Sequence, residues 1–170
     1  MTFDIVSFDP KLDRGRFKSG SVALDQYLQQ QVSQDIRRRV SACFLALDSN
    51  RQVAAYYTLA SASVLLDQLP AAIQNQLPRY AAVPAVRMGR LALAEQYQLQ
   101  GLGSALLADA LARSCGSEIT AFALIVDAKD SKAAHFYLRH GFIALSSQPL
   151  ALFLPLASVS NLVNKKRLGS

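Results

Sequence analysis

The stretch from Val86 to Leu107 constrains the fold more than any other part of the chain. It contains an apolar run, a short polar segment that ends in two glycines, and a second apolar run with helical spacing. Gln98, Gly101 and Gly103 form a Q-x-x-G-x-G pattern where the predicted strand becomes a helix. Glycine lets backbone amides approach a ligand without an intervening Cβ, and a helix start adds unpaired N–H groups and a positive dipole end. The pattern predicts a diphosphate site at this turn, or a turn glycine and a helix-start glycine with a structural role only.

Length and composition indicate one folded domain with an anionic partner. The chain has 170 residues, 51% of them hydrophobic, which is enough to bury a substantial core and argues against disorder. Its formal net charge of +6 favours a nucleotide cofactor, a nucleic acid or an acidic protein segment, without choosing among them. Cys43 and Cys115 are isolated in sequence, so we interpret them as small buried apolar residues and expect no disulfide framework.

Several classes of protein are disfavoured by what the sequence lacks. No apolar run approaches the length that spans a bilayer, and the first residues lack the basic-then-apolar pattern of a secretory signal. We therefore expect a cytoplasmic protein that does not enter a membrane. His135 and His140 are five residues apart with no set of carboxylates nearby, which is not a zinc-ligand spacing, so no metal site is expected.

Hydrophobic periodicity and turn signals predict alternating strands and helices along the chain. A helix is expected after the capping segment Ser19–Ser21, with an apolar stripe that runs from Leu24 to Ile36 and an end near Ile36 or Arg37. Tyr56 and Tyr57 should lie on opposite faces of a strand, one in the core and the other in a groove or in water. Besides the strand in the opening stretch, we expect strands at 3–8, 42–48, 52–63, 119–126, 142–145 and 150–156, and further helices within 64–76, from 102 to about 115, and at 132–140.

Three consecutive arginines, Arg37, Arg38 and Arg39, follow the first predicted helix. Cations at a helix C-terminus compensate its dipole and aid solubility. The same run could instead contact phosphates of a nucleic acid. The residues alone leave both interpretations open.

Two motifs resemble those of the GNAT acetyltransferases. The Q-x-x-G-x-G loop is similar to the family's R/Q-x-x-G-x-G/A pyrophosphate loop, and Ala133–Phe142 resembles its A-x-x-F-Y-x-x-x-G-F segment. The resemblance extends over 82–142 and implies the α/β (α+β) GNAT acyl-CoA N-acyltransferase fold, a mixed central sheet with flanking helices. We expect a single domain at 1–156, a basic tail at 157–170, and acetyl-CoA as cosubstrate. The cofactor residues that the resemblance implies are Leu91, Ala92, Leu93, Gln98, Leu99, Gln100, Gly101, Leu102, Gly103, Ser104, Asp130 and Phe136.

Tyr137 is the residue with an implied catalytic role. In the family, the tyrosine at this position often protonates the departing CoA thiolate, and a phenol with a pKa near 10 is suited to that task. An aromatic residue here could also simply pack on CoA or in the core. No general base is evident: Glu95 is the one acid near the strand end, and a solvated loop carboxylate is the simpler interpretation. An α-amine acceptor, with its lower pKa, suits a site without a strong base.

Four further stretches resemble the GNAT toxins of bacterial toxin–antitoxin modules: Phe17–Leu28, Tyr56–Leu59, Leu77–Pro84 and Gly89–Leu93. Such toxins acetylate the α-amino group of aminoacyl-tRNA, which inhibits translation, and are neutralised by an antitoxin. The resemblance implies these partners, a ribbon-helix-helix antitoxin and a homodimer. It departs from the family at Leu99, where relatives often have a further glycine. Candidate tRNA-binding residues are Arg37, Arg38, Arg39, Arg87 and Arg90. The alternatives are a GNAT enzyme that acts on a small amine or a protein N-terminus, and a non-catalytic module that binds acetyl-CoA.

Overall fold

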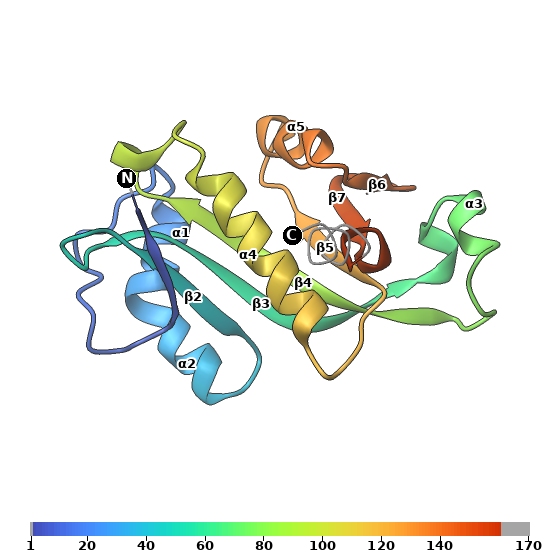
Figure 1. Cartoon of the computed structure of the whole chain (residues 1–170), viewed down its shortest axis with the longest axis horizontal. Helices are drawn as coiled ribbons and strands as arrows, with labels where there is room; N and C mark the ends of the chain where they lie inside the picture. The colour runs from blue at the N-terminus through green and yellow to red at the C-terminus, as the bar shows by residue number, and fades with distance from the viewer. Residues whose placement is uncertain (1, 161–170) are drawn as a thin grey trace, which may run out of the picture. The chain divides into compact units, whose positions relative to one another are not determined.

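The computed structural model describes residues 2–160. Its seven strands form one sheet in the order β1-β2-β3-β4-β5-β7-β6, with helices between them, which confirms the predicted α/β class (Figure 1). The strands are β1 (Asp4–Ser7), β2 (Ala42–Leu47), β3 (Val53–Leu65), β4 (Ala82–Leu93), β5 (Ala123–Asp127), β6 (Ile143–Leu145) and β7 (Gln148–Pro155). The helical elements are α1 (Val22–Gln26), the π-turn η1 (Tyr27–Gln31), α2 (Val32–Arg37), η2 (Leu66–Gln68), α3 (Ala71–Gln74), η3 (Glu95–Tyr97), α4 (Leu102–Gly116) and α5 (Ser131–Arg139).

The chain divides into two compact units, and strands β3 and β4 contribute residues to both. The first unit contains residues 2–60 and 88–110. In it β1 pairs antiparallel with β2, and β2 pairs antiparallel with β3. The strands expected at 42–48 and 52–63 are therefore both present and form an antiparallel pair.

Both tyrosines in the middle of β3 are fully buried, which the sequence analysis predicted for only one of them. The Tyr56 hydroxyl donates to the carbonyl of Leu24 in α1 at 2.7 Å, whereas the Tyr57 hydroxyl donates to Asp109 in α4 at 2.5 Å. Successive strand residues point to opposite faces, so helices cover both faces of the sheet in this unit. The prediction that one tyrosine faces a groove or water was wrong because each face has its own helix.

The helical segment from Val22 to Arg37 begins and ends as predicted, but it is not a regular α-helix. Ser21 caps it by accepting a hydrogen bond from the Leu24 N–H at 3.3 Å. The π-turn at Tyr27–Gln31 interrupts it, and Tyr27, Leu28 and Val32 supply its buried face. Local apolar spacing does not reveal a π-turn, because the extra residue changes the periodicity only within one turn.

The second unit contains residues 61–87 and 111–160, in which β7 pairs antiparallel with both β5 and β6. Its core is formed by apolar residues from β3, β4, β5 and β7, with Leu66 and Leu69 packed among them. Asp130 caps α5 by accepting a hydrogen bond from the Ala133 N–H at 2.9 Å, and Gly141 follows the helix with a φ of +90°. The helix expected at 132–140 is confirmed as α5.

Three predicted boundaries in this unit were wrong. Strand β5 begins at Ala123, and Ile119, which was expected to start it, is 85% exposed. Strand β4 begins at Ala82 and includes Pro84, whereas the predicted strand began at Val86. A proline is tolerated there because only its carbonyl is used: it accepts from the Phe122 N–H at 2.8 Å. Residues 156–160 are helical, so the predicted tail begins as a helix, and the rest of it (161–170) lies outside the described residues.

Candidate active site

The loop predicted to hold a diphosphate lies between β4 and α4 and has the backbone of an anion-binding turn. Leu99 and Gly101 have positive φ angles of 61° and 85°. A Cβ added to Gly101 would have no atom within 4 Å, so glycine is required there by backbone conformation and not by lack of space. Leu99, where relatives often have glycine, adopts the left-handed conformation with its side chain 94% exposed.

Helix α4 supplies the second part of this site. It spans Leu102–Gly116 and begins directly after Gly101, so its first N–H groups and its dipole face the loop. Leu102, Leu106, Leu107 and Ala110 are buried and form the inner face of the helix. Burial of this apolar face fixes the helix start, and the loop and helix together fit the pyrophosphate of acetyl-CoA.

The side chain of Gln98 forms hydrogen bonds within the protein. Its Nε2 donates to the Ser19 carbonyl at 2.8 Å and to the Leu93 carbonyl at 3.1 Å. The neighbouring predicted cofactor residue, Gln100, donates from its Nε2 to the Gln96 carbonyl at 3.0 Å. Both glutamine side chains thus brace the loop internally.

Three more predicted cofactor residues, Leu91, Ala92 and Leu93, form the last part of β4. Ala92 is buried, and the other two are partly buried. Their contribution to a bound pantetheine arm would come from backbone N–H and C=O groups, as in an added strand. The Ala94 N–H directly after them donates to the Ala54 carbonyl at 2.8 Å and holds the strand end against β3.

Tyr137 lies on α5 and is 6% exposed. Its ring contacts Phe136 and Phe142, with centroids 5.2 and 5.4 Å away. Burial, and secondarily the negative charge of Asp127, raise the pKa of the Tyr137 phenol well above its ordinary value. Because its pKa is raised, the Tyr137 hydroxyl keeps its proton near neutral pH.

The two cofactor residues predicted on or near this helix have structural tasks. The carboxylate of Asp130 caps α5, as described above. Phe136 is partly buried, and its ring lies between Tyr137 and His140, 4.6 Å from the latter. Within the described part of the chain, no group of three or more His, Cys, Asp and Glu side chains is arranged to hold a metal ion.

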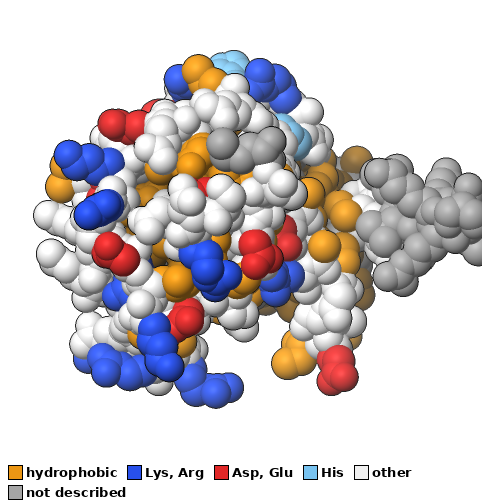
Figure 2. Space-filling view, turned by 60° about the vertical axis from the view of Figure 1, so that its left-hand side comes forward, with side chains coloured by type: hydrophobic (Ala, Val, Ile, Leu, Met, Phe, Trp, Pro, Cys, Tyr) orange, Lys and Arg blue, Asp and Glu red, His pale blue; other side chains and the backbone are white. Residues whose placement is uncertain are grey.

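Of the five arginines predicted to bind tRNA, three are exposed at a helix end and two have partners within the protein. Arg37, Arg38 and Arg39 are exposed at the end of α2, and Arg39 ends the helix with a φ of 60°. Arg87 pairs with Asp127, and Arg90 places its guanidinium over the Tyr27 ring. Figure 2 shows several Lys and Arg side chains gathered at the lower left of one face of the molecule.

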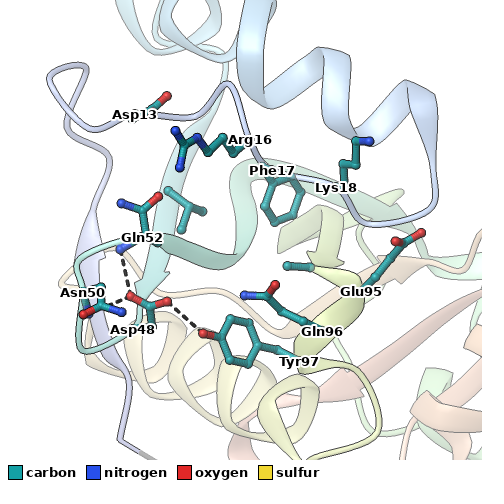
Figure 3. A pocket seen from close by; sticks show the side chains of 12 residues that line it. Asp13, Arg16, Phe17, Lys18, Asp48, Asn50, Gln52, Glu95, Gln96 and Tyr97 are labelled. Carbon is teal, nitrogen blue, oxygen red and sulfur yellow. Dashed lines mark hydrogen bonds between the residues drawn. The ribbon is translucent and has the colours of Figure 1, made fainter.

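One concave feature was not predicted from the sequence. A pocket of about 710 Å³ lies in the first unit between the segment before α1, the tip of the β2–β3 hairpin and η3 (Figure 3). The hydroxyl of Tyr97 donates to Asp48 at 2.8 Å, while the N–H groups of Asn50 and Gln52 donate to the same carboxylate. The hydrogen bonds from these donors lower the pKa of Asp48, and the one from the Gln52 N–H has the largest effect. Glu95, considered as a base, is an exposed residue on the rim of this pocket.

Within residues 2–160, none of the helices has both the length and the apolar character needed to span a membrane.

Comparison with known proteins adds independent evidence. Residues 41–144 match the acetyltransferase (GNAT) domain family. The tRNA-acetylating toxin of Mycobacterium tuberculosis is 34% identical over 140 residues, which are 81% of this chain and 82% of the toxin. The structure of AtaT complexed with acetyl-methionyl-tRNAfMet aligns with a TM-score of 0.88 and 29% identity, and covers 95% of this chain and 99% of that one.

A second solved structure is that of an AtaT mutant toxin bound to the C-terminus of the antitoxin AtaR and acetyl-CoA. It aligns with a TM-score of 0.79 and 26% identity, over 95% of this chain and 98% of that one. The matched family domain covers more than half of the chain and includes the glycine loop, α4 and Tyr137. The glycine loop at the start of α4, the buried phenol and these matches lead to one conclusion: the chain belongs to the GNAT acetyltransferase family.

Proposed function

We propose that this chain transfers the acetyl group of acetyl-CoA to the α-amino group of an aminoacyl-tRNA, and that it acts as a translation-inhibiting toxin held in check by an antitoxin. The observation that carries the proposal is the 34% identity, over four fifths of the chain, to a tRNA-acetylating toxin. The solved AtaT complexes, which contain acetyl-methionyl-tRNAfMet in one case and acetyl-CoA with antitoxin in the other, support it.

The cofactor would be held by backbone groups more than by side chains. Residues 99–104 would surround the pyrophosphate with the N–H groups of the glycine loop and the first turn of α4. The end of β4 would align the pantetheine arm as an added strand. When bound, acetyl-CoA supplies an activated thioester whose acyl carbon accepts the amine.

Tyr137 would act as the general acid. Its hydroxyl would donate its proton to the sulfur as the carbon–sulfur bond breaks, so that CoA leaves as a thiol. The raised pKa keeps this group protonated throughout the physiological range. An α-amine has a pKa of about 7.7–8.0, so a useful fraction of it is unprotonated near neutrality and can attack without a strong base in the protein.

The acceptor would approach the exposed arginines at the end of α2. Arg37, Arg38 and Arg39 have no acidic side chain paired with them in the hydrogen bonds and ion pairs of the described residues, and their side chains reach solvent. Cations placed in this way suit the phosphates of an acceptor stem. Arg87 and Arg90 contribute less to this proposal, because each already has a protein partner.

The remaining assignments are also proposals. We assign residues 1–156 to one GNAT domain with a basic segment after it, which the family match over 41–144 supports. A charged-tRNA substrate requires the reaction to occur where translation takes place, in the cytoplasm. The antitoxin would be of the ribbon-helix-helix type, and the toxin would form a homodimer.

The test is to incubate the purified protein with labelled acetyl-CoA and a pool of charged tRNA, and to identify acetylated aminoacyl-tRNA by mass spectrometry. Uncharged tRNA and the Tyr137→Phe variant serve as controls, and both should give little product. If no isoacceptor is acetylated but small amines or peptide N-termini are, the acceptor assignment is wrong. If coenzyme A binds in calorimetry and nothing is acetylated, the chain is a binding module and not an enzyme.

A further inference from the structure

Hydrogen bonds from Glu95 and Gln98 connect the segment before α1 to the segment between β4 and α4. The Glu95 N–H donates to the Lys18 carbonyl at 2.8 Å. The Gln98 Nε2 donates to the carbonyls of Ser19 and Leu93. One side chain therefore joins the end of β4, the cofactor loop and the entry to α1.

All N–H donors of Gln98 are used in these internal contacts. Its side-chain amide carries two hydrogens, one for each carbonyl, and its backbone N–H donates to the Glu95 carbonyl at 3.3 Å. None of these donors is left for a phosphate. The structure therefore assigns Gln98, one of the predicted cofactor residues, a positioning task.

Ser19 extends this connection into the helix. While its carbonyl accepts from Gln98, its N–H and hydroxyl both donate to the Asp25 carboxylate, at 3.0 and 2.7 Å. The Ser19 Oγ in turn accepts from the Ser21 N–H at 3.2 Å, and Ser21 caps α1. The orientation of the first turn of α1 thus depends on where Gln98 holds Ser19.

The two segments also approach closely at Gly20. This residue has a φ of +92°, and a Cβ added to it would lie 3.4 Å from the Glu95 Oε1. This is an ordinary van der Waals distance to the end of a side chain, and it shows that the two segments are neighbours at this point. We call the group formed by Ser19, Asp25, Leu93 and Gln98 the loop–helix clasp.

We propose that the loop–helix clasp couples cofactor binding to acceptor binding, with Gln98 as its positioning residue. The coupling rests on the proposed function, because the helical segment that starts at Ser21 ends at the arginines assigned to tRNA. Acetyl-CoA that orders the glycine loop would hold Gln98 in place, and Gln98 would hold the start of α1. By linkage, tRNA binding then strengthens cofactor binding by the same factor.

Amide hydrogen exchange tests the clasp, with coenzyme A as the probe. In the wild-type protein, coenzyme A should slow exchange in the peptide Ser19–Gln26 by about threefold or more. The Gln98→Glu variant keeps the side-chain shape but places a carboxylate oxygen against two carbonyls. It should exchange about three- to tenfold faster there, the order expected for losing one or two exposed hydrogen bonds. In this variant, coenzyme A should no longer slow amide exchange in the same peptide.

Three further variants make the result specific. Gln98→Arg retains N–H donors and should restore protection, while Gln96→Ala, on the same short segment, should behave like the wild type. Ser19→Ala leaves the glycine loop untouched but removes the hydroxyl contact to Asp25, and should loosen the same peptide. In activity assays, Gln98→Glu should raise the KM for aminoacyl-tRNA about three- to tenfold as well as that for acetyl-CoA.

The proposal is overturned if Gln98→Glu weakens coenzyme A binding but leaves exchange in Ser19–Gln26 unchanged, because Gln98 would then act on the cofactor alone. It is also overturned if coenzyme A has no effect on that peptide in the wild type. Neither measurement uses tRNA. A protein that shows the clasp yet acetylates no aminoacyl-tRNA would disprove the proposed function and leave the clasp intact.

Discussion

The guanidinium of Arg90 in β4 lies 3.5 Å from the centroid of the Tyr27 ring in the π-turn. Tyr27 is buried, its hydroxyl donates to Asp35 at 2.8 Å, and its ring stacks on Tyr56. Burial, followed by the Asp35 hydrogen bond, raises the pKa of Tyr27 to about 12. Arg90 therefore belongs to a packed group that joins the sheet to the first helical segment.

This relationship predicts that Arg90 contributes mainly to stability. Arg90→Ala should lower the free energy of unfolding by about 1–2 kcal/mol, because a partly buried cation–π contact is lost. Arg87→Ala removes an exposed ion pair and should cost about 1 kcal/mol or less. Urea denaturation of both variants checks this. An unchanged urea midpoint for Arg90→Ala, together with weaker tRNA binding, would show instead that Arg90 acts as a tRNA contact.

The exposed arginines should behave differently. The double variant Arg37→Ala/Arg38→Ala should raise the KM for aminoacyl-tRNA and reduce the salt dependence of tRNA binding by about one to two in log–log slope. Stability and coenzyme A affinity should hardly change. Arg39, which follows the last turn of α2 with a φ of 60°, is left in place so that the helix end is not altered.

A matched control for this variant is Lys11→Ala/Arg79→Ala, which removes the same charge from exposed positions elsewhere. If the two double variants lose tRNA affinity equally, the effect is one of net charge, and the end of α2 is not a specific contact.

Tyr137→Phe should lower kcat by about 10²–10⁴, the range for loss of a general acid, with little change in coenzyme A affinity. The ring contacts to Phe136 and Phe142 are retained, so folding should be preserved. Steady-state kinetics with calorimetry measure the two effects separately. A variant with near-normal kcat would show that the tyrosine only packs.

Alkaline pH should destabilise the protein through its buried tyrosines. Because burial raises the pKa of Tyr137 above that of an unfolded tyrosine, near 10, the folded state retains this proton over a range in which the unfolded state releases it. The resulting stability is fully present below about pH 10 and is lost as the pH rises beyond that. Denaturation midpoints measured from about pH 8 to about pH 11 should fall less steeply for Tyr137→Phe than for the wild type. If the denaturation midpoints of both proteins fall equally steeply with pH, burial of the Tyr137 phenol does not cause the loss of stability.

Gly101→Ala should weaken coenzyme A binding through backbone strain. The added methyl meets no neighbour, but a φ of +85° costs a non-glycine residue about 1–2 kcal/mol, which the loop would relieve by changing shape. Gly116→Ala is a suitable control, since a Cβ there is also free of contacts and no positive φ is required. Calorimetry should show a loss of affinity of about tenfold for the first variant and none for the second.

The sequence by itself determined the features that depend on residues within one turn of each other. The caps at Ser21 and Asp130, the left-handed Gly141 and the strand–loop–helix order around Gly101 follow from short-range hydrogen bonding and backbone sterics. The motifs at the glycine loop and Tyr137 likewise pointed to the family. These signals are local, so no knowledge of distant segments was needed to read them.

Only the tertiary structure decided which groups have partners far away in the chain. It buried both Tyr56 and Tyr57 against different helices, placed Arg90 on Tyr27, and used the donors of Gln98 to hold Ser19 and Leu93. A cation or an amide has the same local pattern whether it faces a phosphate, an aromatic ring or a carbonyl. The choice among these is made by residues that are distant in sequence and adjacent only after folding.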